Sequence, residues 1–467
     1  MKRTTPQNRA RAVAFALASL CCISNSANAK SGNDNLTAID ATGQVSTFTA
    51  SGSIDTTNPF FQVLGSNGRA CSTCHGMKQA WTITPADLQL RFANSSGKDP
   101  VFRTNDGANS PQADVSSVNA RRHAYSMLLN KGVIRVGLPI PPNAEFTLAV
   151  VEDPYSFASA SELSLFRRPL PATNLRFITG VMWDGRETHA SFLPPMDAGA
   201  SMSNMVASLK HQVIDATMGH AQGTTAPSDA QLQQIVSFEL GLTTAQTYDF
   251  NAGYLNDDDA MGGPRILATL QNYIGINDVL GADPVGADFN SSSMTLFDAW
   301  QSPNSHAGGG ARGAIARGEH LFNSKSITIT DVGGLNDALG MPVIAGTCTT
   351  CHDAPNVGNH SVALPINIGT SDATRRTPDM PLYTLRNNAT GAVVQTSDPG
   401  KAMISGKWAD IGKFKGPVLR GLAARPPYFH NGMAASVADV VNFYDTRFTI
   451  GFSAQEKRDL VAFLSAL

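Results

Sequence analysis

The chain has 467 residues, of which 42% are hydrophobic and only 15% are charged, and its formal net charge is −2. This length is ample for two cores of ordinary size. A charge so close to zero gives no sign of nucleic acid or an anionic membrane surface as a partner. Few charges together with 41 glycines and 26 prolines are typical of a fold with long ordered loops.

Residues 1–29 have the three parts of a secretory signal peptide. Lys2 and Arg3 begin a basic segment, residues 12–23 are apolar, and Ala27–Ala29 reads Ala-Asn-Ala, a cleavage site. The apolar run is too short to span a bilayer, and no later stretch approaches a membrane span. The sequence therefore predicts export to the periplasm with cleavage near Ala29.

After a polar segment at 30–56, expected to be an extended N-terminal arm, the chain shows mostly helical periodicity. Apolar residues recur at helical spacing over Met205–Met218 and Gln231–Leu242, and Ser453–Glu456 is a capping box that opens a C-terminal helix. An alternating strand pattern is confined to Glu145–Val151. The sequence predicts a mainly α protein with a small hairpin inserted in the first half.

The four cysteines beyond the signal segment all belong to two Cys-x-x-Cys-His pentads, at 71–75 and at 348–352. This pentad is the attachment signature of a c-type haem, in which two thiols bond the porphyrin edge and the adjacent His ligates the iron. The predicted haem-binding residues are Cys71, Cys74, His75, Cys348, Cys351 and His352.

Three other interpretations of the pentads fit less well. A zinc site needs its ligand pairs close together, whereas more than half the chain separates these two. A thioredoxin-like dithiol does not need the following His and would lie in a βαβ setting. Disulfides would leave both His residues unexplained, so two covalently bound haem c groups are predicted.

A glycine-rich stretch at 306–313 divides the chain between the pentads. The predicted regions are an N-terminal haem domain at 57–305, which contains a large insertion, and a C-terminal haem domain at 314–467. Each pentad follows a Phe-containing segment, Phe60–Leu64 in the first region and Arg317–Phe322 in the second. Two cytochrome c-like domains with long loops are therefore expected.

Several further motifs resemble the bacterial di-haem cytochrome c peroxidase family, which includes MauG-type enzymes. They are Trp-Asp-Gly-Arg at 183–186, Asp-Pro-Gly-Lys-Ala-Met at 398–403, a run at 412–420, and Pro-Tyr-Phe-His-Asn-Gly at 427–432. The resemblance is dense from 311 to 467 and patchy before that. It is specific for the superfamily, though not for one reaction within it.

The resemblance implies two haems with unequal tasks. In the family, a haem with His and Met ligands stores and passes electrons, because a saturated iron with a thioether has a raised potential. The other haem has an open site that binds peroxide. Here Met403 occupies the family's sixth-ligand position for the second haem. The alternative is that Met403 packs in the core, and MauG-type members have Tyr there.

The first haem departs from the family pattern. No His occurs between His75 and His123, where the family places a His that fills the resting iron. The first site is therefore either open at rest or filled by another His. His123 is a candidate, although its helical surroundings favour an ordinary surface or core role over ligation.

The resemblance assigns peroxide cleavage to a distal Gln and Glu that move a proton between the two oxygens. Gln212 matches the Gln, whereas the stretch 217–222 contains no Glu. His220 could transfer the proton because a neutral imidazole suits this role near pH 7. Gln222 could only hydrogen-bond. The other interpretation of His220 is a helix C-terminal His that complements the helix dipole.

Trp183 resembles the family's aromatic residue on the electron path between the haems, and an ordinary buried Trp is the alternative. Asp184 and Arg186 are expected to brace haem propionates or the domain contact. Arg420 and His430 fit the same bracing role. Calcium between the domains is common in the family, but no acidic loop here forms a dedicated site, so calcium stays open.

The sequence and the resemblance together predict a periplasmic di-haem peroxidase that reduces hydrogen peroxide to water. A small cytochrome c or cupredoxin is the expected electron donor, and family members are commonly homodimers. The alternatives are a MauG-like oxidase of a protein or organic substrate, and a non-catalytic electron-transfer cytochrome. The missing Glu favours either alternative over a standard peroxidase.

Overall fold

The structure is a computed structural model that describes residues 36–188, 198–301 and 310–467, all within one unit, Asp34–Leu467. The predicted signal peptide lies outside the described residues. Within the described part of the chain, no helix is long and apolar enough to cross a membrane.

The described helices are α1 (Pro85–Ser95), α2 (Val118–Ala124), α3 (Ser126–Lys131), α4 (Ala198–Asp215), α5 (Asp229–Leu240), α6 (Pro264–Leu267), α7 (Gly310–Ser324), α8 (Asn336–Leu339), α9 (Ala402–Ser405), α10 (Val437–Phe448) and α11 (Ala454–Ser465). The strands are β1 (Leu36–Ile39), β2 (Gly43–Phe48), β3 (Ile134–Leu138), β4 (Phe146–Glu152), β5 (Leu163–Arg167), β6 (Thr243–Asp249), β7 (Gly253–Tyr254), β8 (Ile327–Thr330), β9 (Val343–Gly346), β10 (Leu382–Asn387) and β11 (Val393–Thr396).

The expectation of a mainly α fold is wrong. Helices account for 32% of the structure, and strands in several sheets account for 16%. The strands escaped detection because their buried positions do not alternate with exposed ones. All five residues of β5 are buried, and β6 (Thr243–Asp249) buries two threonines and a glutamine. A strand covered on both faces loses the period-two pattern that sequence analysis detects.

The largest sheet has the strand order β1-β2-β6-β7. Hydrogen bonds between buried threonine side chains stabilise its interior. Thr47 of β2 and Thr244 of β6 are buried, and their hydroxyls lie 2.8 Å apart. The Trp81 indole nitrogen also donates to the Thr47 hydroxyl, at 2.9 Å. These hydrogen bonds let threonine replace apolar side chains in the interior, where an unpaired hydroxyl would be costly.

The strand predicted at Glu145–Val151 is present as β4, but its partner is not a neighbour in the first half of the chain. β4 pairs antiparallel with β10 (Leu382–Asn387), which also pairs with β11. Residues separated by more than two hundred positions are thereby joined in one sheet. A separate antiparallel pair, β3 with β5, lies in the first half.

The predicted long helices are confirmed. Met205–Met218 falls largely in α4, Gln231–Leu242 largely in α5, and the C-terminal helix begins at the predicted capping box, where the Ser453 hydroxyl accepts from the Glu456 amide. Phe60–Leu64, in contrast, begins only a single 3₁₀ turn.

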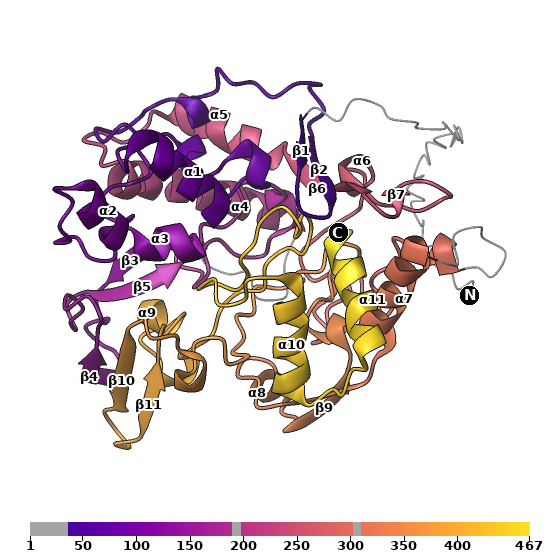
Figure 1. Ribbon diagram of the computed structural model, residues 1–467. Helices are drawn as coiled ribbons and strands as arrows, with labels where there is room; N and C mark the ends of the chain where they lie inside the picture. The colour runs from indigo at the N-terminus through magenta and orange to yellow at the C-terminus, as the bar shows by residue number, and fades with distance from the viewer. Residues whose placement is uncertain (1–35, 189–197, 302–309) are drawn as a thin grey trace, which may run out of the picture. The chain divides into compact units, whose positions relative to one another are not determined.

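Helices α7 and α11 pack side by side (Figure 1). They meet at Gly318, where an added Cβ would lie 2.0 Å from the carbonyl oxygen of Asp459. Only glycine permits this approach. The predicted division at 306–313 falls partly on residues 302–309, which lie outside the described residues, and it stays a prediction.

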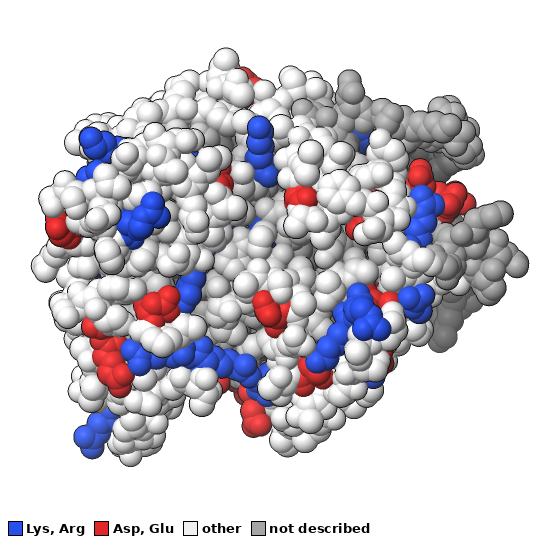
Figure 2. All heavy atoms as spheres, in the orientation of Figure 1, with Lys and Arg blue, Asp and Glu red and all other residues white. Residues whose placement is uncertain are grey.

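Acidic and basic side chains are interspersed on the face drawn in Figure 2. The strongest charge cluster is buried instead. Arg167 of β5 donates to both oxygens of Asp398, at 2.7 and 2.9 Å, and it also bonds Asp184. All three side chains are at most 3% exposed. The cluster therefore fastens three segments that are distant in the sequence: β5, the segment 183–186 and the segment 398–403.

Replacing Arg167 with Met should reduce the free energy of unfolding by about 3–5 kcal/mol, because two buried carboxylates would lose their counter-charge. Chemical denaturation of the purified protein measures this. The matched control is Arg376→Met, which removes an ion pair with the half-exposed Glu152 and should cost at most about 1 kcal/mol. Equal losses in the two variants would contradict the role of the buried cluster.

Candidate functional site

Each pentad lines its own cavity. Cys71, Cys74 and His75 border the first cavity, and Cys348, Cys351 and His352 border the second. All four thiols are free. Burial raises the pKa of Cys71, Cys348 and Cys351 to about 12, and that of Cys74 is raised as well. Two cysteine pairs in separate cavities do not fit one zinc site, which needs its four ligands close together.

The two pentads fold in the same way. Each cysteine pair lies on one 3₁₀ turn, closed by Cys74 N–H to Cys71 O at 3.2 Å and by Cys351 N–H to Cys348 O at 3.3 Å. In each turn, a Thr hydroxyl accepts from the amide three residues earlier, at 3.0 Å. The turn brings both thiols to the same cavity and places the adjacent His beside them.

Both pentad histidines are held in the form that a metal requires. The Nδ1 atom of His75 lies 3.1 Å from the Trp81 carbonyl oxygen, and that of His352 lies 2.6 Å from the Gly358 carbonyl oxygen. A proton on Nδ1 leaves the Nε2 lone pair for the iron. Burial lowers the pKa of His75 to about 4 and also lowers that of His352, which keeps both rings neutral.

Buried positive charge borders the two cavities without acidic partners. Lys415 and Arg425 line both cavities, Arg420 lines the first, and Arg168 lines the second. In the described part of the chain, none of the four forms an ion pair, and Nε and Nη2 of Arg420 and Nε of Arg425 have no hydrogen-bond partner. Burial lowers the pKa of Lys415 to about 8, of Arg168 to about 9, and of both other arginines to about 10.

These cations need anions at the cavities. The propionate carboxylates of haem c would supply this negative charge. The thiols, the neutral imidazoles and the unpartnered cations therefore fit haem c in both cavities.

His220 belongs to a hydrogen-bonded chain at the first cavity. It lies on a π-helical turn, Ala216–His220, that follows α4, and such turns are frequent at functional sites. Its Nδ1 atom lies 2.6 Å from one oxygen of Asp106, whose other oxygen accepts from Arg69 at 2.5 Å. Burial opposes ionisation of Asp106, but the His220 hydrogen bond and the Arg69 charge outweigh it and lower the pKa. The carboxylate thus holds the proton on Nδ1 and leaves Nε2 as an acceptor.

Other residues predicted for the first haem are placed differently. Gln212 of α4 lines the first cavity together with His220. His123 is exposed, with Nδ1 2.8 Å from the Asn119 carbonyl oxygen, and it is not among the described residues that line either cavity. Gln222 instead accepts a hydrogen bond from Asn67.

The segment around Trp183 separates the two cavities. Met182 lines the first cavity and Trp183 lines the second. The indole nitrogen of Trp183 donates to the Arg168 carbonyl oxygen at 2.8 Å, and its own carbonyl accepts from the Lys415 amide at 2.9 Å. Asp184 accepts hydrogen bonds from Arg167 and Arg186, and it is not among the described residues that line either cavity.

Met403 lies away from the second cavity. Its side chain is 4% exposed and packs in an apolar cluster with Phe146, Leu165 and Tyr383. Among the described residues that line the second cavity, His360 and His430 are present and Met403 is not. Ligation of the iron by Met403 therefore stays a prediction that this arrangement does not support.

Sequence analysis missed Glu239, a buried acid at the first cavity. It lies on α5, and one of its carboxylate oxygens has no hydrogen-bond partner. Burial raises its pKa from the ordinary 4.5 to about 8, so the side chain holds a proton at neutral pH. Its position could have revealed it, because it continues the apolar face of Leu232, Ile235 and Val236 at helical spacing. Asp106 and Arg69 gave no comparable signal.

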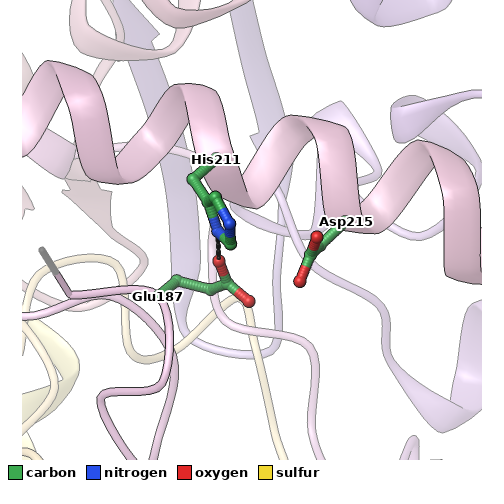
Figure 3. Close-up of side chains that lie close together, drawn as sticks. All are labelled: Glu187, His211 and Asp215. Atoms are coloured by element: carbon green, nitrogen blue, oxygen red, sulfur yellow. Dashed lines mark hydrogen bonds and ion pairs between the residues drawn. The ribbon is translucent and has the colours of Figure 1, made fainter. Parts of the chain in front are cut away.

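Among the residues that the structure describes, two groups of three side chains could hold a metal ion. Figure 3 shows His211 and Asp215 of α4 beside Glu187, with His211 Nδ1 2.6 Å from Glu187 Oε2. The second group consists of Asp278, Asp353 and His360, all buried. Each group includes a His, whereas calcium prefers oxygen ligands alone. Calcium therefore stays an open expectation.

Comparisons with known proteins give partial matches. No protein-family model matches the chain. It is 34% identical over 133 residues to the cytochrome-c peroxidase IdrP2 of Denitromonas iodatirespirans, covering 26% of this chain and 36% of that protein. It is 31% identical over 153 residues to the cytochrome-c peroxidase IdrP1 of Pseudomonas sp. (strain SCT), covering 27% and 38%. The chain thus spans little more than a third of the length of these curated relatives.

Among solved structures, a MauG-like protein associated with microbial copper homeostasis matches at 16% identity with a TM-score of 0.31, over 67% of this chain and 76% of that one. A superposition this loose supports no conclusion. Over the matched segments, the chain is similar in sequence to curated cytochrome-c peroxidases, in agreement with the resemblance that the two pentads and the other motifs indicate.

Proposed function

We propose that the protein is an exported di-haem cytochrome c peroxidase that reduces hydrogen peroxide to water with electrons from a small cytochrome c or cupredoxin. The observation that carries this proposal is the His220–Asp106–Arg69 chain at the cavity of the first pentad. It offers the proton-transfer group that peroxide cleavage needs and that the missing distal Glu had put in doubt.

Haem c, when bound, supplies an iron that takes up peroxide and delivers electrons to it. The protein's part is to move the protons. Two electrons and two protons convert one hydrogen peroxide molecule into two waters. With Nδ1 donating to Asp106, the Nε2 atom of His220 accepts a proton from the oxygen that stays and returns it to the oxygen that leaves. Gln212, which lines the same cavity, orients the peroxide by hydrogen bonding.

Electrons enter at the second haem and reach the first by way of Trp183. The support for this route is that the two cavities share a wall, which includes Lys415 and Arg425. Trp183 lies on the second cavity, directly after Met182 on the first. Its indole is fixed by a hydrogen bond to Arg168, so the ring keeps one orientation between the sites.

A MauG-like oxidase is the second candidate. The observation that favours it is the absence of a carboxylate in the stretch 217–222, where the family's peroxidases have a Glu. In that case electrons would come from a protein or organic substrate, and the same proton chain would serve.

Absorption and EPR spectra of the purified protein test the function. The expected result is two haems per chain and a ferric high-spin haem that reacts when hydrogen peroxide is added. With a reduced donor cytochrome, peroxide should be consumed over many turnovers. A protein whose haems both stay low-spin and ignore peroxide would be an electron-transfer cytochrome, and turnover only with an organic or protein substrate would indicate the oxidase.

Replacing His220 with Ala should lower peroxide turnover by about 10²–10⁴-fold, the usual contribution of a positioned acid–base group. The measurement is kcat with equal haem content in both proteins. His211→Ala is the matched control, because His211 lies on α4 but not among the residues that line the first cavity, and its turnover should equal that of the unsubstituted protein. Full activity in His220→Ala would remove His220 from the mechanism.

Replacing Glu239 with Gln should make stability less dependent on pH. The folded-state pKa of about 8 lies above the ordinary value of 4.5, so the folded protein binds a proton that the unfolded chain has lost. The contribution of protonated Glu239 to the free energy of unfolding is therefore fully present below pH 4.5 and is lost as the pH rises towards 8. At about 1.4 kcal/mol per pKa unit, the loss amounts to a few kcal/mol.

Thermal unfolding of both proteins between these pH values checks the Glu239 prediction. The unsubstituted protein should lose stability with rising pH relative to the Gln variant. Glu152→Gln, at a half-exposed position, should behave like the unsubstituted protein. A constant difference between Glu239→Gln and the unsubstituted protein across the range would show that Glu239 is ionised throughout.

A further inference from the structure

The second cavity contains an unassigned histidine, His430, whose ring nitrogen is free to bind a metal. Besides the pentad, the described residues that line this cavity include two histidines, His360 and His430. In both, Nε2 is buried without a hydrogen-bond partner. An iron ligated by His352 on one side offers a sixth position on the other, and the two histidines differ in how they could reach it.

His360 is tied to the side of His352. It follows the pentad on a short loop that bonds to His352 itself, because the Nδ1 atom of His352 lies 2.6 Å from the Gly358 carbonyl oxygen. The Nδ1 atom of His360 lies 2.8 Å from the carboxylate of Asp353, the residue after His352. This short connection ties His360 to the segment that carries His352.

His430 is held by a different part of the chain. Its carbonyl oxygen accepts from the Arg168 amide at 2.6 Å, and the neighbouring Asn431 side chain donates to the Thr370 carbonyl oxygen at 3.1 Å. The imidazole stacks on Phe414 with ring centroids 3.9 Å apart and planes 18° apart. Nδ1 lies 3.4 Å from the Thr370 hydroxyl oxygen. The ring is therefore fixed, with Nε2 as its only unengaged polar atom.

The ring neighbours place His430 and His352 in different surroundings. The His352 ring lies near the rings of Phe322 and Tyr444, with centroid distances of 5.8 and 6.5 Å. The His430 ring lies near the rings of Phe414 and Trp183, with centroid distances of 3.9 and 6.3 Å. The two histidines therefore line one cavity and share no aromatic neighbour.

An ion pair with Asp398 is the competing role for His430. The Nε2 atom lies 3.9 Å from an Asp398 oxygen, beyond hydrogen-bond distance. Asp398 already accepts two hydrogen bonds from Arg167 and one from the Gly400 amide, at 2.8 Å.

We propose that Nε2 of His430, rather than the thioether of Met403, is the sixth ligand of the haem at the second pentad. This inference rests on the proposed function only in assuming that a haem occupies the second cavity. The second haem then has two imidazole ligands, from His352 and His430. Such an iron is saturated and passes electrons without binding peroxide, at a lower potential than a His–Met haem would have.

The ligands are read from the ferric holoprotein without peroxide, by near-infrared magnetic circular dichroism and EPR. The His220→Ala background is used, so that a second imidazole at the first haem cannot come from His220. The expected result is a low-spin haem with two imidazole ligands and no far-red thioether-to-iron band. A thioether band in this protein that disappears in Met403→Leu would overturn the proposal.

Variants of the two candidate ligands complete the test. His430→Ala should turn the second haem high-spin, and added imidazole should restore the low-spin signal. His430→Met should produce the thioether band and raise the potential of that haem, which keeps the test usable if the Ala variant fails to fold. Met403→Leu, close in volume, should leave the spectrum and the potential unchanged. An unaltered low-spin signal in His430→Ala would limit His430 to a bracing role.

The outcome is independent of peroxide turnover. A haem with two imidazole ligands that respond to substitution of His430 supports the ligation even in a protein that ignores peroxide, and that combination would overturn the proposed function alone. Turnover in a protein with a His–Met second haem would do the reverse.

Discussion

Buried positive charge without protein counter-charge is the constraint on which the site depends. Lys415, Arg420, Arg425 and Arg168 border the two cavities, and none has an acidic partner among the described residues. Burying an unpaired charge costs several kcal/mol per ion. Anions in the cavities would offset this cost. The propionates of haem c are the anions that the pentads would bring, so cofactor attachment and charge compensation are one requirement.

The two pentads have similar surroundings, yet the two cavities differ in the other residues that line them. Both turns and both proximal histidines are built alike, and the shared cations treat the two haem edges alike. The difference lies in what faces each cavity from the other side. His220, the proposed proton-transfer group, is hydrogen-bonded to Asp106 at the first cavity, whereas His430, an imidazole whose Nε2 has no partner, lines the second. The difference between the two cavities therefore comes from His220 and His430 rather than from the turns that carry the cysteines.

Sequence reasoning predicted what depends on local spacing. The pentads and the helices α4, α5 and α11 follow from residues close together in the chain, whereas Gln212 and His220 were predicted from the family resemblance and line the first cavity. The buried strands did not follow, because β5 is covered on both faces and β6 buries threonines that bond to one another. The contact between Asp106 and His220 was not predicted either, because 114 positions separate the two residues in the sequence.

Met403 shows why a motif match does not assign a role to each of its residues. The segment 398–403 occurs where the family resemblance places it, yet its firmest contact is made by Asp398, which Arg167 fastens to β5 and to Asp184. With Asp398 fixed in that buried cluster, α9 packs Met403 against β4 and β10. The sheet that β4 and β10 form was not visible in the sequence, so nothing in the motif indicated that its methionine would be occupied there. With Met403 in that apolar cluster and His430 among the residues that line the second cavity, with its Nε2 unpartnered, the arrangement supports His430 over Met403 as the proposed ligand.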